Sequence, residues 1–320
     1  MKKILLLLIL LICPALSYAA CTTAAASGTF TSTSTLTAAS TSSPTSAATA
    51  VNCGSGSLLS LGSDNYIIYQ FTSATNLSGS RATLKKDTTT DNIPVKMCID
   101  SACATELIQG ASYTYNYSAL NLLGLGGNSN FSIPLYFSTI TGQTVAAGTY
   151  TVQITITATY RVCTLIGLGS VCVGLQTGTL SIPITLTLVL SNDCSTIVAP
   201  ALSFGSAPLV SSFSTVSQTI NVTCSKGSTY TVGLSNGSYY STTRNMASGT
   251  NRLAYEIYKG TSGTNRWGPS GTERWSSSTA TTPATTGTVS AFTYTAQILS
   301  TQLTPAAGSY TDNVTVDLSF

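Results

Sequence analysis

The stretch Tyr150-Thr-Val-Gln-Ile-Thr-Ile-Thr-Ala-Thr-Tyr160 decides the fold class of this chain. Val152, Ile154 and Ile156 alternate with polar residues, so one face of an extended segment is apolar and the other is polar. A period of two built from β-branched residues is typical of a half-buried antiparallel strand. We therefore expect a strand here, with its apolar face on a core.

The same alternation recurs in two other segments. Residues 180–190 alternate through Ile182, Ile184, Leu186 and Leu188, and residues 308–320 end on Val314, Val316, Leu318 and Phe320. Turns rich in Gly, Asn and Ser separate these segments, and no part of the mature chain shows a helical period. The sequence predicts an all-β protein made of sandwiches.

An internal repeat divides the chain. Gln143-Thr-Val-Ala-Ala-Gly-Thr-Tyr-Thr returns as Gln302-Leu-Thr-Pro-Ala-Ala-Gly-Ser-Tyr-Thr, and the spacing of Cys21 and Cys53 resembles that of Cys194 and Cys224. This duplication predicts two homologous domains, 20–190 and 191–320.

The two copies differ after their shared strand. The first continues through 161–177 into a further strand at 178–190, whereas the second stops at Phe320. A sandwich that lacks one strand exposes an apolar groove and unpaired backbone groups. We expect the second domain to be incomplete in this way.

The first residues are typical of a cleaved signal peptide. Lys2 and Lys3 precede an apolar run from Ile4 to Ile12, which is too short to span a bilayer. Ser17-Tyr18-Ala19 is a small-x-small cleavage site, so we expect residues 1–19 to be removed on export. Acylation of Cys21 is the alternative, disfavoured by Tyr18.

Cysteine usage agrees with export, because an even set remains once Cys13 leaves with the signal peptide. The duplicated long spacing and two short spacings predict four local disulfides: Cys21–Cys53, Cys98–Cys103, Cys163–Cys172 and Cys194–Cys224.

Charge and histidine content exclude several function classes. Only 7% of residues are charged and there is no histidine. We expect no metal site, because no CxxC pair or histidine supplies ligands. The chain has no basic clusters for nucleic acid. It also has no Ser-His triad or paired carboxylates. We expect a protein that is not an enzyme and that has no cofactor.

The second domain carries the motifs of a known family. They run in order: Cys194, Leu202-Ser-Phe-Gly205, Ile220-Asn-Val-Thr-Cys224, Tyr230–Gly237, Leu253-Ala-Tyr-Glu-Ile-Tyr258, Asn265-Arg-Trp-Gly268 and Gly308–Phe320. This pattern resembles the spore coat U domain family, and in particular the two-domain tip adhesins of archaic chaperone–usher pili of the Csu type. The first domain resembles it more loosely, through Cys21, Cys53, Ile93–Cys98 and Ala147–Tyr150.

The resemblance implies two immunoglobulin-like sandwiches, an N-terminal adhesin domain (20–190) and a C-terminal pilin domain (191–320). It implies that the pilin domain is completed first by a periplasmic chaperone and then by the donor strand of the next subunit, with passage through an outer-membrane usher. The assembly residues are then Val314, Val316, Leu318 and Phe320. Because Cys21 follows the cleavage site closely, we expect no donor strand, and hence a place at the pilus tip on the cell surface.

Three apolar, glycine-rich segments of the first domain are candidates for surface contact. They are 57–62, 120–127 and 165–175. Hairpin tips are normally polar, so leucines there predict exposed fingers that grip apolar or abiotic surfaces and support biofilm formation. The candidate residues are Leu58, Leu59, Leu61, Leu120, Leu122, Leu123, Leu125, Leu165, Ile166, Leu168, Val171 and Val173.

Three alternatives remain open at this point. In the first alternative, the leucines of the three glycine-rich segments are core residues. In the second, Trp267 and Trp275 form a sugar-binding platform with Arg266 and Arg274, making the chain a lectin-like adhesin. In the third, the chain is a structural coat or fibre subunit.

Overall fold

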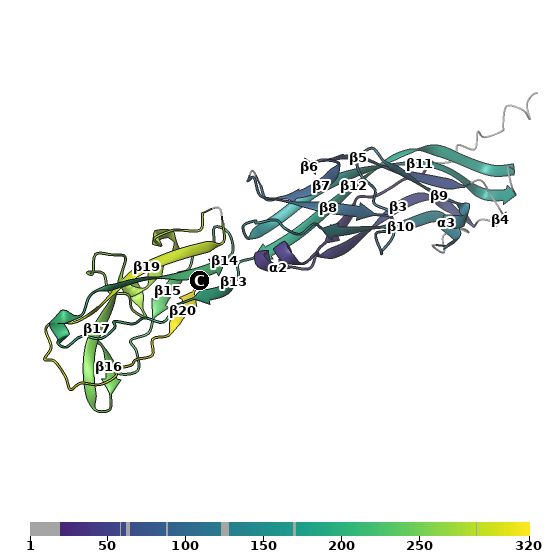
Figure 1. Ribbon diagram of the computed structural model, residues 1–320. Coiled ribbons are helices and arrows are strands. Elements are labelled where there is room, and N and C mark those ends of the chain that lie inside the picture. Colours follow the sequence, from purple (N-terminus) through teal and green to yellow (C-terminus); the bar gives the residue numbers. More distant parts are fainter. Residues whose placement is uncertain are drawn as a thin grey trace, which may run out of the picture. The chain divides into compact units, whose positions relative to one another are not determined.

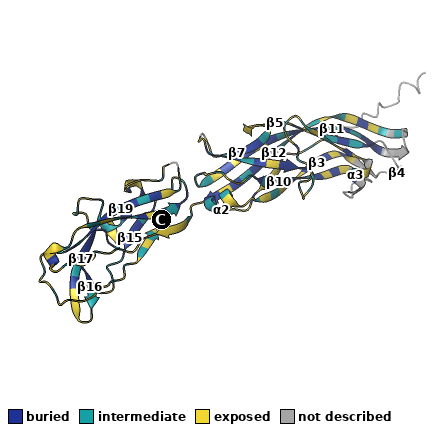
Figure 2. Cartoon of the chain, viewed as in Figure 1, coloured by how far each residue is buried: buried dark blue, intermediate teal, exposed yellow. Residues whose placement is uncertain are grey.

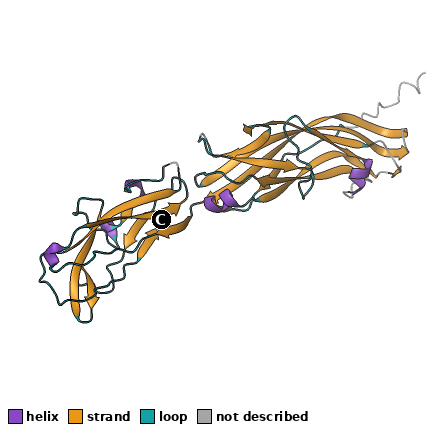
Figure 3. Ribbon diagram, viewed as in Figure 1, coloured by secondary structure: helices purple, strands orange, loops and turns teal. Residues whose placement is uncertain are grey.

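The computed structural model describes residues 20–57, 59–61, 65–87, 89–122, 128–168, 171–285 and 287–320. The predicted signal peptide lies outside these residues. Strands dominate the described part, and its helices are short, so the all-β prediction is confirmed (Figure 3). Among the described residues, no helix is long and apolar enough to cross a membrane.

The chain forms two compact units. The N-terminal unit comprises residues up to Thr31, Ser42–Ile140 and Thr149–Leu188, and the C-terminal unit comprises Ser32–Thr41, Thr141–Gly148 and Val189–Phe320. Each unit carries its own sheets and buried side chains.

The first half of the chain alternates long strands with short ones (Figure 1). The elements, in order, are β1 (Ala26–Thr29), β2 (Thr33–Ser34), α2 (Thr35–Ser40), β3 (Pro44–Ser57), β4 (Leu59–Leu61), β5 (Tyr66–Ala74), β6 (Leu77–Ser78), β7 (Arg81–Lys85), β8 (Asn92–Cys98), β9 (Ser112–Asn116), α3 (Tyr117–Leu122), β10 (Asn128–Thr139), β11 (Gly148–Leu168) and β12 (Val171–Ser191).

The strand β12 completes the N-terminal unit. The main path of its sheet runs β1-β12-β11-β7-β8-β10-β3, so β12 lies between β11 and the first strand. It pairs in parallel with β1, from Ala26 opposite Ile184 to Thr29 opposite Thr187. Its alternate apolar residues are all at most 2% exposed, and they are Ile182, Ile184, Leu186, Leu188 and Leu190. Figure 2 shows the resulting alternation of buried and exposed positions.

The second half of the chain builds two smaller sheets. Its elements are β13 (Cys194–Val198), η1 (Val210–Ser212), β14 (Val216–Cys224), β15 (Thr231–Leu234), β16 (Arg244–Ser248), β17 (Asn251–Lys259), η2 (Gly271–Glu273), β18 (Trp275–Ser276), η3 (Ser277–Thr279), β19 (Val289–Ile298) and β20 (Val316–Ser319). One sheet has the order β13-β14-β19-β17-β16 and the other β18-β15-β20.

Both tryptophans belong to the core of the C-terminal unit. Trp267 is fully buried and Trp275 is 7% exposed, and their rings meet edge to face at 5.0 Å. Their indole N–H groups donate to the carbonyl oxygens of Val232 and Thr279, each at 2.9 Å. Because both rings are buried in the core, the alternative of a sugar-binding platform at these residues is wrong.

A buried ionic network fixes the loops around these rings. The guanidinium of Arg244 is fully buried and donates to Glu256 at 2.5 Å and to the carbonyl oxygens of Leu234, Ser235 and Trp267. Arg266 bridges Glu256 at 2.8 Å and Glu273 at 2.5 Å. Burial lowers the pKa of Arg244, and the pairing with Glu256 opposes that shift. The motif residues 253–258 and 265–268 thus serve the fold.

The structure contains the four predicted disulfides. They join Cys21 to Cys53, Cys98 to Cys103, Cys163 to Cys172 and Cys194 to Cys224. The bridge Cys21–Cys53 ties the segment before β1 to β3, beside the pair Thr22–Asn52, and the bridge Cys194–Cys224 joins β13 to β14.

Candidate functional site

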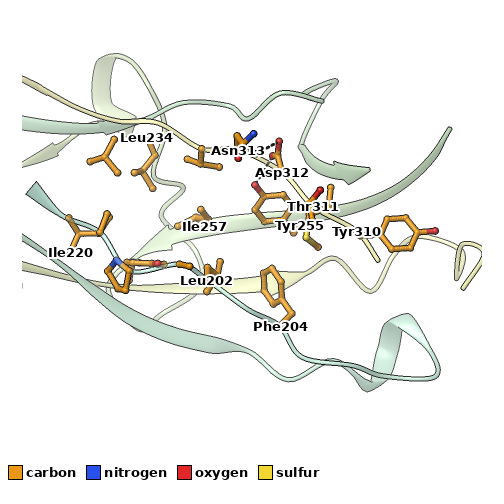
Figure 4. Close-up of a pocket in the computed structure, with 17 residues that line it drawn as sticks. Leu202, Phe204, Ile220, Leu234, Tyr255, Ile257, Tyr310, Thr311, Asp312 and Asn313 are labelled. Carbon is orange, nitrogen blue, oxygen red and sulfur yellow. Dashed lines mark hydrogen bonds between the residues drawn. The ribbon is translucent and has the colours of Figure 1, made fainter. Parts of the chain in front are cut away.

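A groove opens into the core of the C-terminal unit. It contains a cavity of about 380 Å³ that is lined by aliphatic, aromatic and polar side chains. Its lining residues are Ala199, Pro200, Ala201, Leu202, Phe204, Ile220, Leu234, Met246, Tyr255, Ile257, Tyr294, Tyr310, Thr311, Asp312, Asn313, Val314 and Val316. In Figure 4, Leu202 and Phe204 lie on one side of this cavity, and Asp312 and Asn313 lie on the other.

The two walls of the groove carry little regular pairing. Residues 199–204 follow β13 without forming a strand. On the other side, Thr311 forms a single bridge with Ala247, and β20 pairs only with β15. Each wall therefore presents backbone groups that an added strand could use.

The equivalent strand of the N-terminal unit shows what the groove lacks. Its inward residues Val152, Ile154, Ile156, Ala158 and Tyr160 are at most 3% exposed. By the repeat, their counterparts are Asp312, Val314, Val316 and Leu318, all half-buried, and Phe320, which is 65% exposed. In the N-terminal unit β12 pairs along the edge of β11, between β11 and β1, and adds its own buried side chains to the same core. The groove is thus the position that β12 fills in the first copy.

The predicted assembly residues are only part of this site. Val314 and Val316 line the groove, Leu318 packs against the core, and the ring of Phe320 lies 6.3 Å from that of Tyr230. Sequence reasoning missed the opposite wall, including Leu202 and Phe204. The spacing from Cys194 to Phe204 was the available signal, because it nearly repeats the spacing from Cys21 to Phe30.

One carboxylate holds the wall in place. Asp312 accepts hydrogen bonds from the backbone N–H groups of Ser238 and Asn313, both at 2.8 Å, and from the hydroxyl of Tyr255 at 2.7 Å. Burial raises the pKa of Tyr255, and its hydrogen bond to Asp312 raises it further. The segment 310–316 is therefore anchored beside the groove even though it lacks a continuous ladder.

The three predicted finger segments converge at one end of the N-terminal unit. β4 pairs in parallel with β11, with Leu59 opposite Ile166 and Leu61 opposite Leu168. β10 places Asn128, which follows the segment 120–127, opposite Ser57. The backbone therefore gathers segments that lie far apart in the sequence, near α3 and β4 in Figure 1.

One of the predicted finger residues is a core residue instead. Leu120 is 1% exposed, because α3 turns its side chain inward, so its predicted surface role is wrong. The carboxamide oxygen of Asn116 accepts from the N–H of Ala119 at 3.0 Å, which caps this helix.

For the other candidate surface residues, the predicted contact with apolar surfaces stays a prediction. Leu58, Leu123 and Leu125 lie outside the described residues. The backbone of Leu59, Leu61, Leu122, Leu165, Ile166, Leu168, Val171 and Val173 is described, but their side chains are not. Leu175, in the same segment as several of them, is 45% exposed. In the part of the chain that the structure describes, no group of His, Cys, Asp or Glu is placed to hold a metal ion.

Comparison with protein families places the chain. The model of the Spore Coat Protein U domain matches residues 9–157 and again 180–317. The chain belongs to this family. The two matches correspond to the two copies of the repeat. No curated protein matches this chain.

A solved structure has a fold similar to that of this chain. The chain is similar to a chain of the CsuC–CsuE chaperone–tip adhesion subunit pre-assembly complex from archaic Csu pili of Acinetobacter baumannii. The identity is 24% and the TM-score 0.54, over 94% of this chain and 100% of that one. The CupB6 tip adhesin of Pseudomonas aeruginosa matches at 11% identity and a TM-score of 0.37, over 94% of each chain, which is too distant to carry an argument. The fold is that of a chaperone–usher pilus tip adhesin.

Proposed function

We infer that this chain is the tip adhesin of an archaic chaperone–usher pilus. It is exported by its signal peptide and held by a periplasmic chaperone. At an outer-membrane usher it then receives the donor strand of the next subunit, and it is displayed on the cell surface. The observation that carries this proposal is the groove, whose wall residues are buried in the N-terminal copy and half-exposed in the C-terminal one. The likeness to a tip subunit solved with its chaperone supports the same partners.

The partner of the groove is an extended strand. The inward positions of 310–320 alternate, and residues 199–204 and 310–315 form no strand along the groove, so an added strand with alternate apolar residues would extend both the side-chain packing and the backbone pairing. No deep pocket for a small molecule is needed for this role.

The first experiment tests the chaperone. The full chain is produced in the periplasm with and without the chaperone encoded with its pilus. We expect a soluble one-to-one complex with the chaperone, and aggregation or proteolysis of the chain without it. A stable, monomeric chain whose recovery does not depend on the chaperone contradicts the proposed completion of the groove.

The N-terminal unit is proposed to supply the adhesive surface. Its support is the convergence of three leucine-rich segments at one end, together with the exposed Leu175. Each partly buried leucine contributes at most about 1.5–3 kcal/mol, so one pilus binds weakly and many pili on one cell bind strongly. This mode needs apolar area rather than a defined hydrogen-bonding ligand.

The second experiment tests this surface. Leu59→Asp and Leu168→Asp should abolish attachment of cells to polystyrene while the melting temperature stays within a few degrees. Leu77→Asp is the matched control, since Leu77 is an exposed leucine of the same unit outside the three segments. Normal attachment by both variants, with pili intact, contradicts the surface role and leaves a structural fibre subunit as the reading.

A further inference from the structure

The strand β12 and its neighbour β1 show how tightly a filled groove is packed. Gly28 of β1 lies opposite Leu186 of β12. A Cβ atom at Gly28 would lie 3.0 Å from Leu186 Cδ2 and 3.2 Å from the carbonyl oxygen of Ser46. Leu186 is fully buried. The leucine therefore fits only because its partner residue has no side chain.

The C-terminal unit carries a leucine at the equivalent place. Both copies start at a disulfide cysteine and reach a phenylalanine that faces the core side, Phe30 in one and Phe204 in the other. The second segment is one residue longer, and the β13–β14 ladder takes up that residue as an irregularity between Cys194 and Thr196. Counting back from the phenylalanine, Gly28 corresponds to Leu202.

The side chain of Leu202 projects into the groove. It lines the cavity and packs against the core cluster while staying half-buried. It thus occupies space that the Leu186 side chain takes in the N-terminal unit. A large residue on an incoming strand would meet Leu202 at this point, and overpacking of this kind is unfavourable.

We propose that Leu202 is a size-selecting residue of the groove, so that the strand which fills it carries a small residue, Ala or Gly, opposite Leu202 and large apolar residues at the neighbouring inward positions. This inference rests on the proposed function, since it assumes that an extended strand fills the groove. It adds a selection rule that the first copy of the repeat does not have, because Gly28 there admits a leucine.

Synthetic peptides copied from β12 test the rule. The probes are the peptide of residues 178–190, the same peptide with Leu186→Ala, and a matched control with Leu188→Ala. Leu188 is also fully buried in β12 and points to the same side as Leu186. The full chain is refolded with each peptide and binding is measured by tryptophan fluorescence. The chain has two tryptophans, Trp267 and Trp275, so this signal reports the C-terminal unit.

We expect the Leu186→Ala peptide to bind about tenfold more tightly than the unsubstituted peptide, because it relieves the overlap with Leu202. The Leu188→Ala peptide should bind more weakly than either, because it only loses buried area. In a Leu202→Gly chain the affinities of these two peptides should reverse, so that the unsubstituted peptide binds more tightly than the Leu186→Ala peptide. The peptide comparison on the unsubstituted chain stands even where that variant folds poorly.

Other rankings overturn the inference in distinguishable ways. If the unsubstituted peptide binds the natural chain at least as tightly as the Leu186→Ala peptide, Leu202 does not select by size, and the proposed strand acceptor survives. If no peptide binds either form of the chain, the groove does not accept a strand, and the proposed function fails together with the size rule.

Discussion

The same substitution in the two copies of one strand should have different consequences. Val152 and Val316 are both valines on the inward face of the repeated strand, but Val152 is 2% exposed and Val316 is half-buried beside the groove. Val152→Ala removes about 1.6 kcal/mol of apolar transfer free energy and leaves a cavity, for a total cost of about 2–3 kcal/mol. Val316→Ala should cost about 0.8 kcal/mol in the free chain, because solvent already reaches that side chain.

For chaperone affinity the order of the two substitutions should be the opposite, with Val316→Ala having the larger effect. A chaperone strand over Val316 completes its burial, so Val316→Ala should weaken chaperone binding by about fivefold, equivalent to about 1 kcal/mol. Val152→Ala should leave that affinity unchanged. Denaturant unfolding of dilute chain, freshly released from the chaperone complex, gives the unfolding free energies before aggregation sets in, and the tryptophan signal assigns the transition of the C-terminal unit.

Two results would refute this reasoning. If Val316→Ala destabilises the free chain as much as Val152→Ala, the groove is closed in solution and its wall is an ordinary core. If Val316→Ala leaves chaperone affinity unchanged, the partner does not bind over this wall.

Two further predictions concern the buried polar groups. Glu256→Gln should lower the free energy of unfolding by on the order of 3–5 kcal/mol, because it leaves the fully buried Arg244 uncompensated. Glu106→Gln should lower it by under about 1 kcal/mol, because its partner Arg81 is 40% exposed. Denaturant unfolding of the two variants compares these losses, and equal losses would contradict the buried network. Burial raises the pKa values of four tyrosines, Tyr69, Tyr115, Tyr150 and Tyr255, so the folded state favours their protonated forms. The free energy of unfolding should therefore hold below about pH 10 and fall as the pH rises past it. Phenolate absorbance should rise together with unfolding, and a phenolate signal from these groups in the folded chain near pH 10 would contradict their burial.

Periodicity and cysteine spacing carried the prediction of the fold. The alternation in 150–160 and 180–190 reflects which side chains face the core, and these are the residues found at most 3% exposed. The disulfide partners follow from short spacings and from the repeat, because strand pairing brings near neighbours in sequence together.

Some residues that the sequence offered as surface contacts are core residues, because the composition of their own segment does not show which other strands pack on them. Leu120 stands in a glycine-rich run that looks like a hairpin tip, yet the cap at Asn116 starts a helical turn that buries it. Trp267 and Trp275 stand among arginines as sugar-binding residues do, but backbone carbonyl oxygens satisfy their N–H groups inside the core. The wall at 199–204 was missed because its alternation is limited to Leu202 and Phe204, after Ala199-Pro-Ala, which is too short to stand out as a strand.

The proposed completion of the C-terminal unit by an outside strand links its assembly to its folding. In the N-terminal unit β12 follows β11 in the same chain and pairs beside it, so filling this position costs no association entropy. In the C-terminal unit the corresponding residues are half-exposed, and in the proposed assembly a strand from outside loses translational freedom when it pairs beside them. Burying several alternate side chains, at about 1 kcal/mol for each half-buried one, together with new backbone pairing, has to exceed that cost. Every term that favours the incoming strand also stabilises the fold of the unit, because the strand binds the folded state alone. By the proposed size rule, Leu202 therefore affects both the choice of the incoming strand and the stability of the unit.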